Sequence, residues 1–191
     1  MRYIKREPGL GILLSSKSSN KISVYCDADW ASCPNTRRSV SGFIIKHGET
    51  LLSWKSKTQN VVSRSSAEAE YRSMTNAVSE LVWIIALLKE LGKEMEQPAM
   101  VYSDSKAALQ IAANPVFHER TKHIEIDCHF IRQKIQEGVM KTEHVGSKEQ
   151  LADILTKGLH RLQHECLVSK LGVLNVFTPT SLRGSNEIGI T

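Results

Sequence analysis

The chain has 191 residues, of which 41% are hydrophobic and 24% charged, and its net charge at pH 7 is +5. These values are typical of globular proteins and exclude a wholly disordered chain. No apolar stretch reaches the roughly 18 residues that a membrane-spanning helix needs, and the N-terminus lacks the apolar core of a signal peptide. The four cysteines have no paired spacing. We therefore expect one intracellular domain with reduced thiols and no membrane partner.

The positive charge is concentrated at the start of the chain. Residues 1–64 carry 11 Lys and Arg against 4 Asp and Glu, which gives a net charge of +7. Residues 65–98 have a net charge of −3, and the remaining residues have a net charge of +1. A basic region of this kind is either a solvated surface or a site of phosphate contact on a nucleic acid, and charge alone leaves both readings open.

The first half of the chain is rich in strand patterns. Residues 1–14 mix apolar and basic side chains, which suits the end of a helix that begins upstream. Residues 22–27 alternate between apolar and polar side chains and predict a strand. Residues 40–46 and 50–56 are rich in β-forming residues and flank His47-Gly48, which predicts a hairpin. The domain is therefore expected to open with three antiparallel strands.

A long amphipathic helix follows, and after it strands and helices alternate. Ser65 and Glu68 form a capping box that opens the helix, and Gly92 ends it after residue 91. The later expected elements are a strand at 99–103, helices at 105–113 and 121–136, a strand at 139–145, a helix from a second capping box at 147–150 through 156, and a helix at 160–171. An irregular tail follows Asn175. This order predicts an α/β fold in which helices pack on a mixed sheet.

Four acidic residues fall at strand ends or helix starts of this map, namely Asp27, Glu70, Asp104 and Asp153. Converging carboxylates repel one another unless cations lie among them, and clusters of oxygen ligands suit Mg²⁺ or Mn²⁺. Two such ions about 4 Å apart can drive phosphodiester hydrolysis. Other interpretations stay open at this point. Asp104 can cap a helix, Glu70 and Asp153 can stabilise helix N-termini, and Asp27 can be a turn residue.

The sequence around these acids resembles a known family. Five runs carry the resemblance, in this order: YCDADWASCPNTRRSVSGFI, SWKSKTQNVVSRSSAEAEY, VYSDSKAAL, NPVFHERTKHIEIDCHFIR and EQLADILTK. They resemble the ribonuclease H domain of copia-type long-terminal-repeat retrotransposon Pol polyproteins, in the form found in plants. The similarity spans about residues 3–175.

This resemblance implies the ribonuclease H-like fold, with a five-stranded mixed sheet in the order 3-2-1-4-5. It also implies an endonuclease that uses two Mg²⁺ ions, for which Mn²⁺ can substitute. The enzyme hydrolyses the RNA strand of an RNA–DNA hybrid during reverse transcription and leaves 5′-phosphate ends. The expected partners are the hybrid and the reverse transcriptase domain of the same polyprotein, in a cytoplasmic particle or the nucleus.

Matched position by position, the family's catalytic and metal-binding acids fall on Asp27, Glu70, Asp104 and Asp153. Asp29 and Glu68 share these motifs but are left out, because Asp29 lies beyond the strand end and Glu68 serves the capping box. Cellular ribonucleases H carry a histidine in a mobile loop before the last acid. The loop at 145–148 has none, and we do not expect His144 to replace it. Product release or the final proton transfer is therefore expected to differ.

Several smaller features complete the prediction. The expected contacts to nucleic acid are Arg37, Arg38, Lys55, Lys57, Arg120 and Lys122. Zinc binding by the histidines and Cys128 near residue 125 is not expected, because their spacing is poor for sharing one metal ion.

The chain is expected to divide into a connection segment (1–20), the ribonuclease H domain (21–158), a C-terminal helix (159–174) and a tail (175–191). The alternative function is that of a catalytically idle retrotransposon remnant or a host-retained nucleic-acid-binding module.

Overall fold

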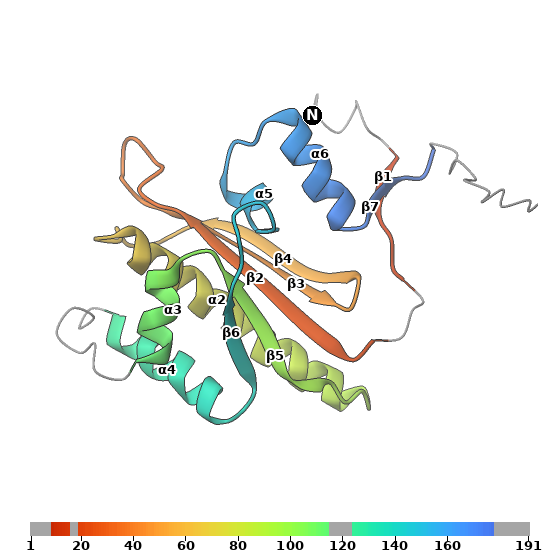
Figure 1. The fold of residues 1–191 in the computed structure, drawn as a ribbon, viewed down its shortest axis with the longest axis horizontal. Helices are drawn as coiled ribbons and strands as arrows, with labels where there is room; N and C mark the ends of the chain where they lie inside the picture. Colours follow the sequence, from red (N-terminus) through yellow and green to blue (C-terminus); the bar gives the residue numbers. More distant parts are fainter. Residues whose placement is uncertain (1–8, 16–18, 115–123, 178–191) are drawn as a thin grey trace, which may run out of the picture.

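The structure is a computed structural model that describes residues 9–15, 19–114 and 124–177, and in it helices pack on both faces of a mixed β-sheet (Figure 1). The elements are, in chain order, β1 (Leu10–Ile12), β2 (Lys21–Asp29), β3 (Val40–His47), β4 (Thr50–Thr58), α2 (Ser66–Glu90), β5 (Glu96–Ser103), α3 (Lys106–Ala113), α4 (Glu125–Gln136), β6 (Met140–His144), α5 (Asp153–Thr156), α6 (Arg161–Lys170) and β7 (Val173–Asn175).

The main sheet has five strands in the order β4-β3-β2-β5-β6, which confirms the predicted order. Strands β2, β3 and β4 are antiparallel neighbours, as expected for the opening meander. Strand β5 runs parallel to β2, and β6 runs parallel to β5. Because parallel strands end at the same edge of a sheet, Asp27 near the end of β2 and Asp104 just after β5 come to one edge.

Helix α2 begins at the predicted capping box. The Ser65 hydroxyl accepts a hydrogen bond from the Glu68 amide at 3.2 Å, and the Glu68 carboxylate accepts one from the Arg64 amide at 2.7 Å. One face of the helix buries apolar side chains against the sheet, and Gly92 ends it with a φ of 74°. Neither α2 nor any other helix within the described ranges is both long and apolar enough to cross a bilayer.

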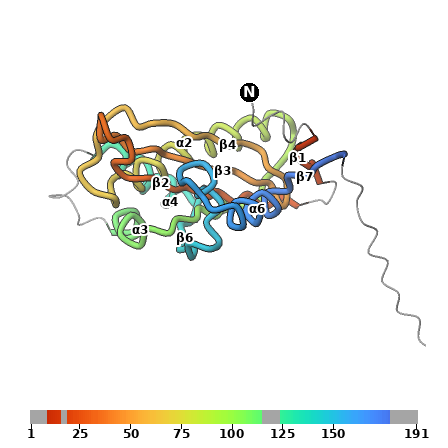
Figure 2. The backbone as a smooth tube through the Cα atoms, turned by 90° about the horizontal axis from the view of Figure 1, so that it is seen from above, coloured from red at the N-terminus to blue at the C-terminus, as the bar shows by residue number. Residues whose placement is uncertain are grey.

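The sheet separates two apolar clusters. On one face, Val24, Cys26 and Phe43 pack with side chains from α2, α3 and α4. On the other face, Ile44 and Leu51 pack with residues in and before α5 and α6. Figure 2 shows α2 and α6 on opposite sides of the strands. Successive side chains along one strand therefore pack into opposite layers. The side chain of Asp27 points to the face that α5 covers.

The N-terminal segment corrects a prediction. Leu10–Ile12 forms a strand, not the end of a helix, and it pairs antiparallel with β7 in a separate two-stranded sheet. The Leu13 amide donates to the Gly172 carbonyl at 2.9 Å and extends this pairing. The two ends of the described chain therefore lie side by side (Figure 1). The proposed division of the chain into four segments stays a prediction, and its tail beyond residue 177 lies outside the described residues.

The second predicted capping box is also wrong. Residues 147–149 form a turn, and the helix contains only Asp153–Thr156, without a side-chain cap. The reason is that Gln150 is buried: it donates to the Cys26 carbonyl of β2 at 2.9 Å and accepts from the Ala152 amide at 3.2 Å. This segment is thus anchored to the sheet, and the anchor precedes Asp153 directly.

Candidate active site

Asp27 is fixed from both faces of the sheet. Its side chain is fully buried, and its backbone pairs with Gly42 of β3. The Ser73 hydroxyl of α2 donates to the Asp27 carbonyl at 2.8 Å and lies 3.2 Å from the Gly42 carbonyl. On the opposite face, the Thr156 hydroxyl of α5 donates to Oδ2 of Asp27. Asp27 is thus a rigid carboxylate between the two layers.

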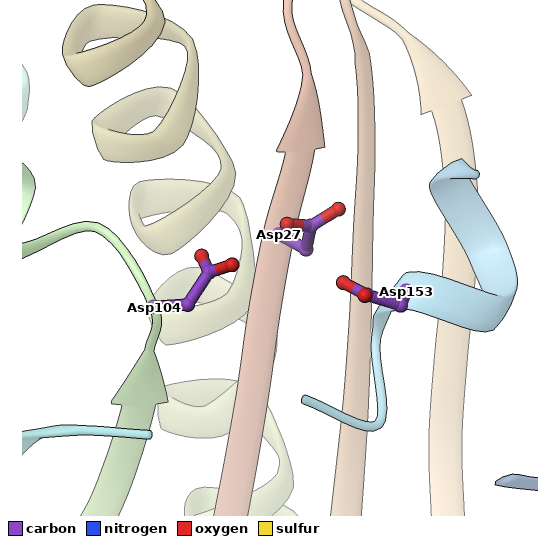
Figure 3. A group of neighbouring side chains, drawn as sticks. All are labelled: Asp27, Asp104 and Asp153. Atoms are coloured by element: carbon purple, nitrogen blue, oxygen red, sulfur yellow. The ribbon is translucent and has the colours of Figure 1, made fainter. Parts of the chain in front are cut away.

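Two further aspartates meet Asp27 (Figure 3). Asp104 follows β5, and Ser105, not Asp104, caps helix α3 by accepting from the Ala108 amide at 3.2 Å. Asp153 is the first residue of α5. One carboxylate oxygen from each of the three aspartates lies within 4.8 Å of the others. The structure therefore brings together three of the four acids that the sequence singles out.

Helix α5 reaches this position because β3 carries a glycine beneath it. A Cβ atom on Gly42 would lie 2.7 Å from Cγ2 of Thr156 and 2.9 Å from Cβ of Leu155, both closer than a van der Waals contact allows. The Ser56 hydroxyl of β4 donates to the Leu155 carbonyl at 2.6 Å and secures the same contact. Gly42 is therefore required for the close approach that places Asp153.

Glu70, the fourth acid, lies beside the three aspartates but outside their group. It occupies the second turn of α2 and is 8% exposed, and its Oε2 atom has no hydrogen-bond partner. Burial, reinforced by the negative charges of Asp27 and Asp104, raises the pKa of Glu70 to about 9. A buried carboxyl group with an unpartnered oxygen is costly by itself, and its place beside the aspartates is compatible with a cation that binds there.

Lys157 is a site residue that the sequence does not single out. Its Nζ atom lies 2.7 Å from Oδ1 of Asp153, 3.1 Å from Oδ1 of Asp27 and 3.9 Å from Oδ2 of Asp104. Burial opposes the charged form of this lysine, but its hydrogen bonds to Asp153 and Asp27 prevail and raise its pKa. The signal in the sequence is its spacing of four residues from Asp153, which is the spacing of an ion pair on a helix.

The cluster has the chemistry of a divalent-cation site. Burial, and then the charge of Asp27, raise the pKa of Asp104. Burial also raises the pKa of Asp153, against the opposing hydrogen bond from Lys157. The carboxylates thus gather negative charge that a single ammonium compensates only in part. An all-oxygen donor set with one unpartnered buried oxygen is compatible with Mg²⁺ or Mn²⁺.

Four of the six basic residues predicted to contact nucleic acid lie within the described residues, and their contacts stay a prediction. Arg37 and Arg38 are exposed in the loop between β2 and β3. Lys55 and Lys57 are exposed on the edge strand β4, where Lys55 lies opposite Phe43 and therefore faces the α2 layer, away from the carboxylates. They line a hollow of about 260 Å³ beside α2. Arg120 and Lys122 lie outside the described residues.

Comparisons with curated proteins relate the chain to transposons. It is 45% identical to a retrovirus-related Pol polyprotein from the Arabidopsis thaliana transposon RE1 over 92% of its length, and 32% identical to that from the Nicotiana tabacum transposon TNT 1-94 over 91%. The chain spans only 12% and 13% of these two relatives. No family model matches the chain.

Comparisons with solved structures identify the fold. LC11-RNase H1, isolated from compost, superposes with a TM-score of 0.55 at 19% identity, and the match covers 72% of this chain and 93% of that one. The same enzyme in complex with an RNA/DNA hybrid gives a TM-score of 0.51 at 18% identity, covering 71% of this chain and 94% of that one. At this level of identity the likeness establishes the architecture, which confirms the expected ribonuclease H-like fold.

Proposed function

Because this chain belongs with the Pol polyproteins of copia-type transposons and has the ribonuclease H fold, we propose that it is a metal-dependent endonuclease. Its substrate is the RNA strand of an RNA–DNA hybrid formed during reverse transcription, and its products carry 5′-phosphate and 3′-hydroxyl ends. The observation that supports this function most strongly is the cluster of Asp27, Asp104 and Asp153 at one edge of the sheet, with Glu70 buried beside it.

In this proposal Asp27, Glu70, Asp104 and Asp153 hold two Mg²⁺ ions, for which Mn²⁺ can substitute. When bound, such ions supply charge neutralisation and an activated water for phosphodiester hydrolysis. The protein contributes a rigid frame. The Ser73 and Thr156 hydroxyls fix Asp27 from two sides, and Gln150 anchors the segment that carries Asp153. No protein side chain needs to act as the nucleophile.

Recognition of the hybrid is expected to depend on shape, because a transposon enzyme must cleave any sequence of its own transcript. Shape readout uses groove width, phosphates and 2′-hydroxyl groups. Arg37 and Arg38 in the loop between β2 and β3 are proposed as phosphate contacts, and so are Lys55 and Lys57 on the edge strand β4. LC11-RNase H1 is a relative in fold that was solved with a hybrid. The reverse transcriptase domain of the same polyprotein is the proposed protein partner.

The proposal is tested by incubating the purified chain with an RNA–DNA hybrid, double-stranded RNA, single-stranded RNA and double-stranded DNA, each labelled at one end. We expect cleavage of the hybrid's RNA strand alone, in Mg²⁺ or Mn²⁺, with full loss in EDTA. A polymerase should extend the upstream fragment directly if its end is a 3′-hydroxyl. Binding of the hybrid without cleavage in either metal would refute the nuclease and support a nucleic-acid-binding module.

A further inference from the structure

Lys157 occupies the centre of the carboxylate cluster. Its ammonium contacts Asp153 and Asp27 at 2.7 and 3.1 Å and lies 3.9 Å from Asp104. These are the three residues whose oxygens lie within 4.8 Å of one another. The ammonium and the Thr156 hydroxyl together occupy both carboxylate oxygens of Asp27. A metal ion that binds Oδ1 of Asp27 would lie beside the ammonium and compete with it for the same carboxylate oxygen.

The formal charges of the cluster favour displacement of the ammonium. Four ionised carboxylates carry four negative charges, which two divalent ions balance in full. If the ammonium stayed, the loaded cluster would hold one excess positive charge at short range, where the surrounding protein screens charge poorly. Without metal, by contrast, the ammonium reduces repulsion among the buried acids. Lys157 therefore stabilises the metal-free cluster and destabilises the metal-loaded cluster.

The lysine has a route out of the cluster. It follows the last residue of α5 in an extended backbone conformation, with φ −113° and ψ 146°, and its side chain is 37% exposed. The side chain thus already reaches solvent at this position. Its long aliphatic stem can turn further outwards while Asp153 stays fixed at the start of the helix.

We propose that Lys157 is a tethered counter-ion that holds the carboxylate cluster together in the metal-free protein and competes with divalent cations for it. This inference rests on the proposed metal-dependent function, and it adds an exchange in which each loading event moves the ammonium of Lys157 out of the cluster. Lys157 is a positioning residue, since its ammonium touches the ligands and not the substrate.

The first test measures Mn²⁺ affinity by the electron paramagnetic resonance signal of free Mn²⁺, without substrate. Lys157→Met removes the competitor and is expected to bind Mn²⁺ roughly tenfold tighter, the equivalent of one charge-assisted hydrogen bond. Lys157→Arg keeps the charge, so its Mn²⁺ affinity should stay within about twofold of the wild-type value. The tenfold change expected of Lys157→Met corresponds to about 1.4 kcal/mol and is clearly larger. Lys134→Met is the matched control, because Lys134 also contacts a carboxylate at 2.7 Å, that of Glu137 directly after α4.

The second test uses the wild-type chain, so it does not depend on whether Lys157→Met folds without metal. Lysines are labelled with an amine-reactive ester and quantified by mass spectrometry with and without saturating Mn²⁺. We expect Mn²⁺ to accelerate the labelling of Lys157 and to leave Lys134 unchanged. Equal Mn²⁺ affinity in the wild type and Lys157→Met, or slower labelling of Lys157 with Mn²⁺, would overturn the competition and leave the nuclease proposal standing. No Mn²⁺ binding by either protein would overturn both.

Discussion

The contact between Gly42 and α5 allows the most specific prediction, because a single methyl group at this position must move the helix. In Gly42→Ala the new Cβ would meet Cγ2 of Thr156 at 2.7 Å and Cβ of Leu155 at 2.9 Å. The threonine methyl can rotate away, but a Cβ atom moves only with its backbone. To restore an ordinary contact of 3.4 Å, α5 must retreat by about 0.5 Å, and Asp153 moves with it.

Such overpacking costs about 1–3 kcal/mol, which corresponds to a Tm lower by roughly 2–12 °C in a chain of this size. The cleavage rate is expected to suffer more than the stability, because a catalytic group that is misplaced by about 1 Å can lower the rate about a hundredfold. We therefore expect hybrid cleavage by Gly42→Ala to fall on the order of ten- to a hundredfold, measured in single turnover at a temperature where the variant is folded.

Gly146→Ala is the matched control, because a Cβ at Gly146 meets no atom within 4 Å. Its Tm and its cleavage rate should both equal those of the wild type. A Gly42→Ala variant with the wild-type rate and Tm would refute the reasoning, since it would mean that the position of α5 does not depend on this contact.

Two further predictions concern buried polar residues. The pKa of Glu70 is raised by burial and by Asp27 and Asp104 to about 9 from an ordinary 4.5, so the folded metal-free protein keeps a proton that the unfolded chain releases. The stability contributed by the Glu70 proton is complete below about pH 4.5 and is lost as the pH rises towards 9. Since glutamine does not titrate, the Tm of Glu70→Gln in EDTA should rise relative to the wild-type Tm between about pH 5 and pH 9. A Tm difference that stays constant over this range would contradict the prediction. Gln150→Ala loses the hydrogen bonds to Cys26 and Ala152, and urea unfolding should show a loss of about 2–4 kcal/mol. The exposed Gln163→Ala serves as its control and should stay within about 0.5 kcal/mol of the wild type.

The main sheet and α2 could be predicted from the sequence because their signals are local. Alternation along β2, the turn at His47-Gly48 and the capping box at Ser65 each lie within a few residues. The same local logic placed Asp104 directly after a strand and Asp27 near the end of one, although β2 continues to Asp29. Parallel pairing of β2 with β5 then brings the two aspartates to one edge.

Other features depend on contacts between distant residues and left no local signal. Strand β1 exists only because it pairs with β7, more than 160 residues later in the chain. The capping-box pattern at 147–150 was misleading because Gln150 bonds to β2 rather than to the start of a helix. The role of Lys157 follows from the convergence of three carboxylates on its ammonium, from β2, from the end of β5 and from α5. The sequence spacing reveals only the pair with Asp153.

The central claim is that the aspartate cluster hydrolyses the hybrid, and its most direct test compares the cleavage rates of Asp104→Asn and Asp29→Asn in Mg²⁺. Both changes remove one negative charge, but only Asp104 belongs to the cluster. We predict that Asp104→Asn cleaves the RNA strand at least about a hundredfold more slowly than the wild type, while Asp29→Asn stays close to the wild-type rate. Cleavage by Asp104→Asn at the full wild-type rate would contradict the assignment of this cluster as the active site.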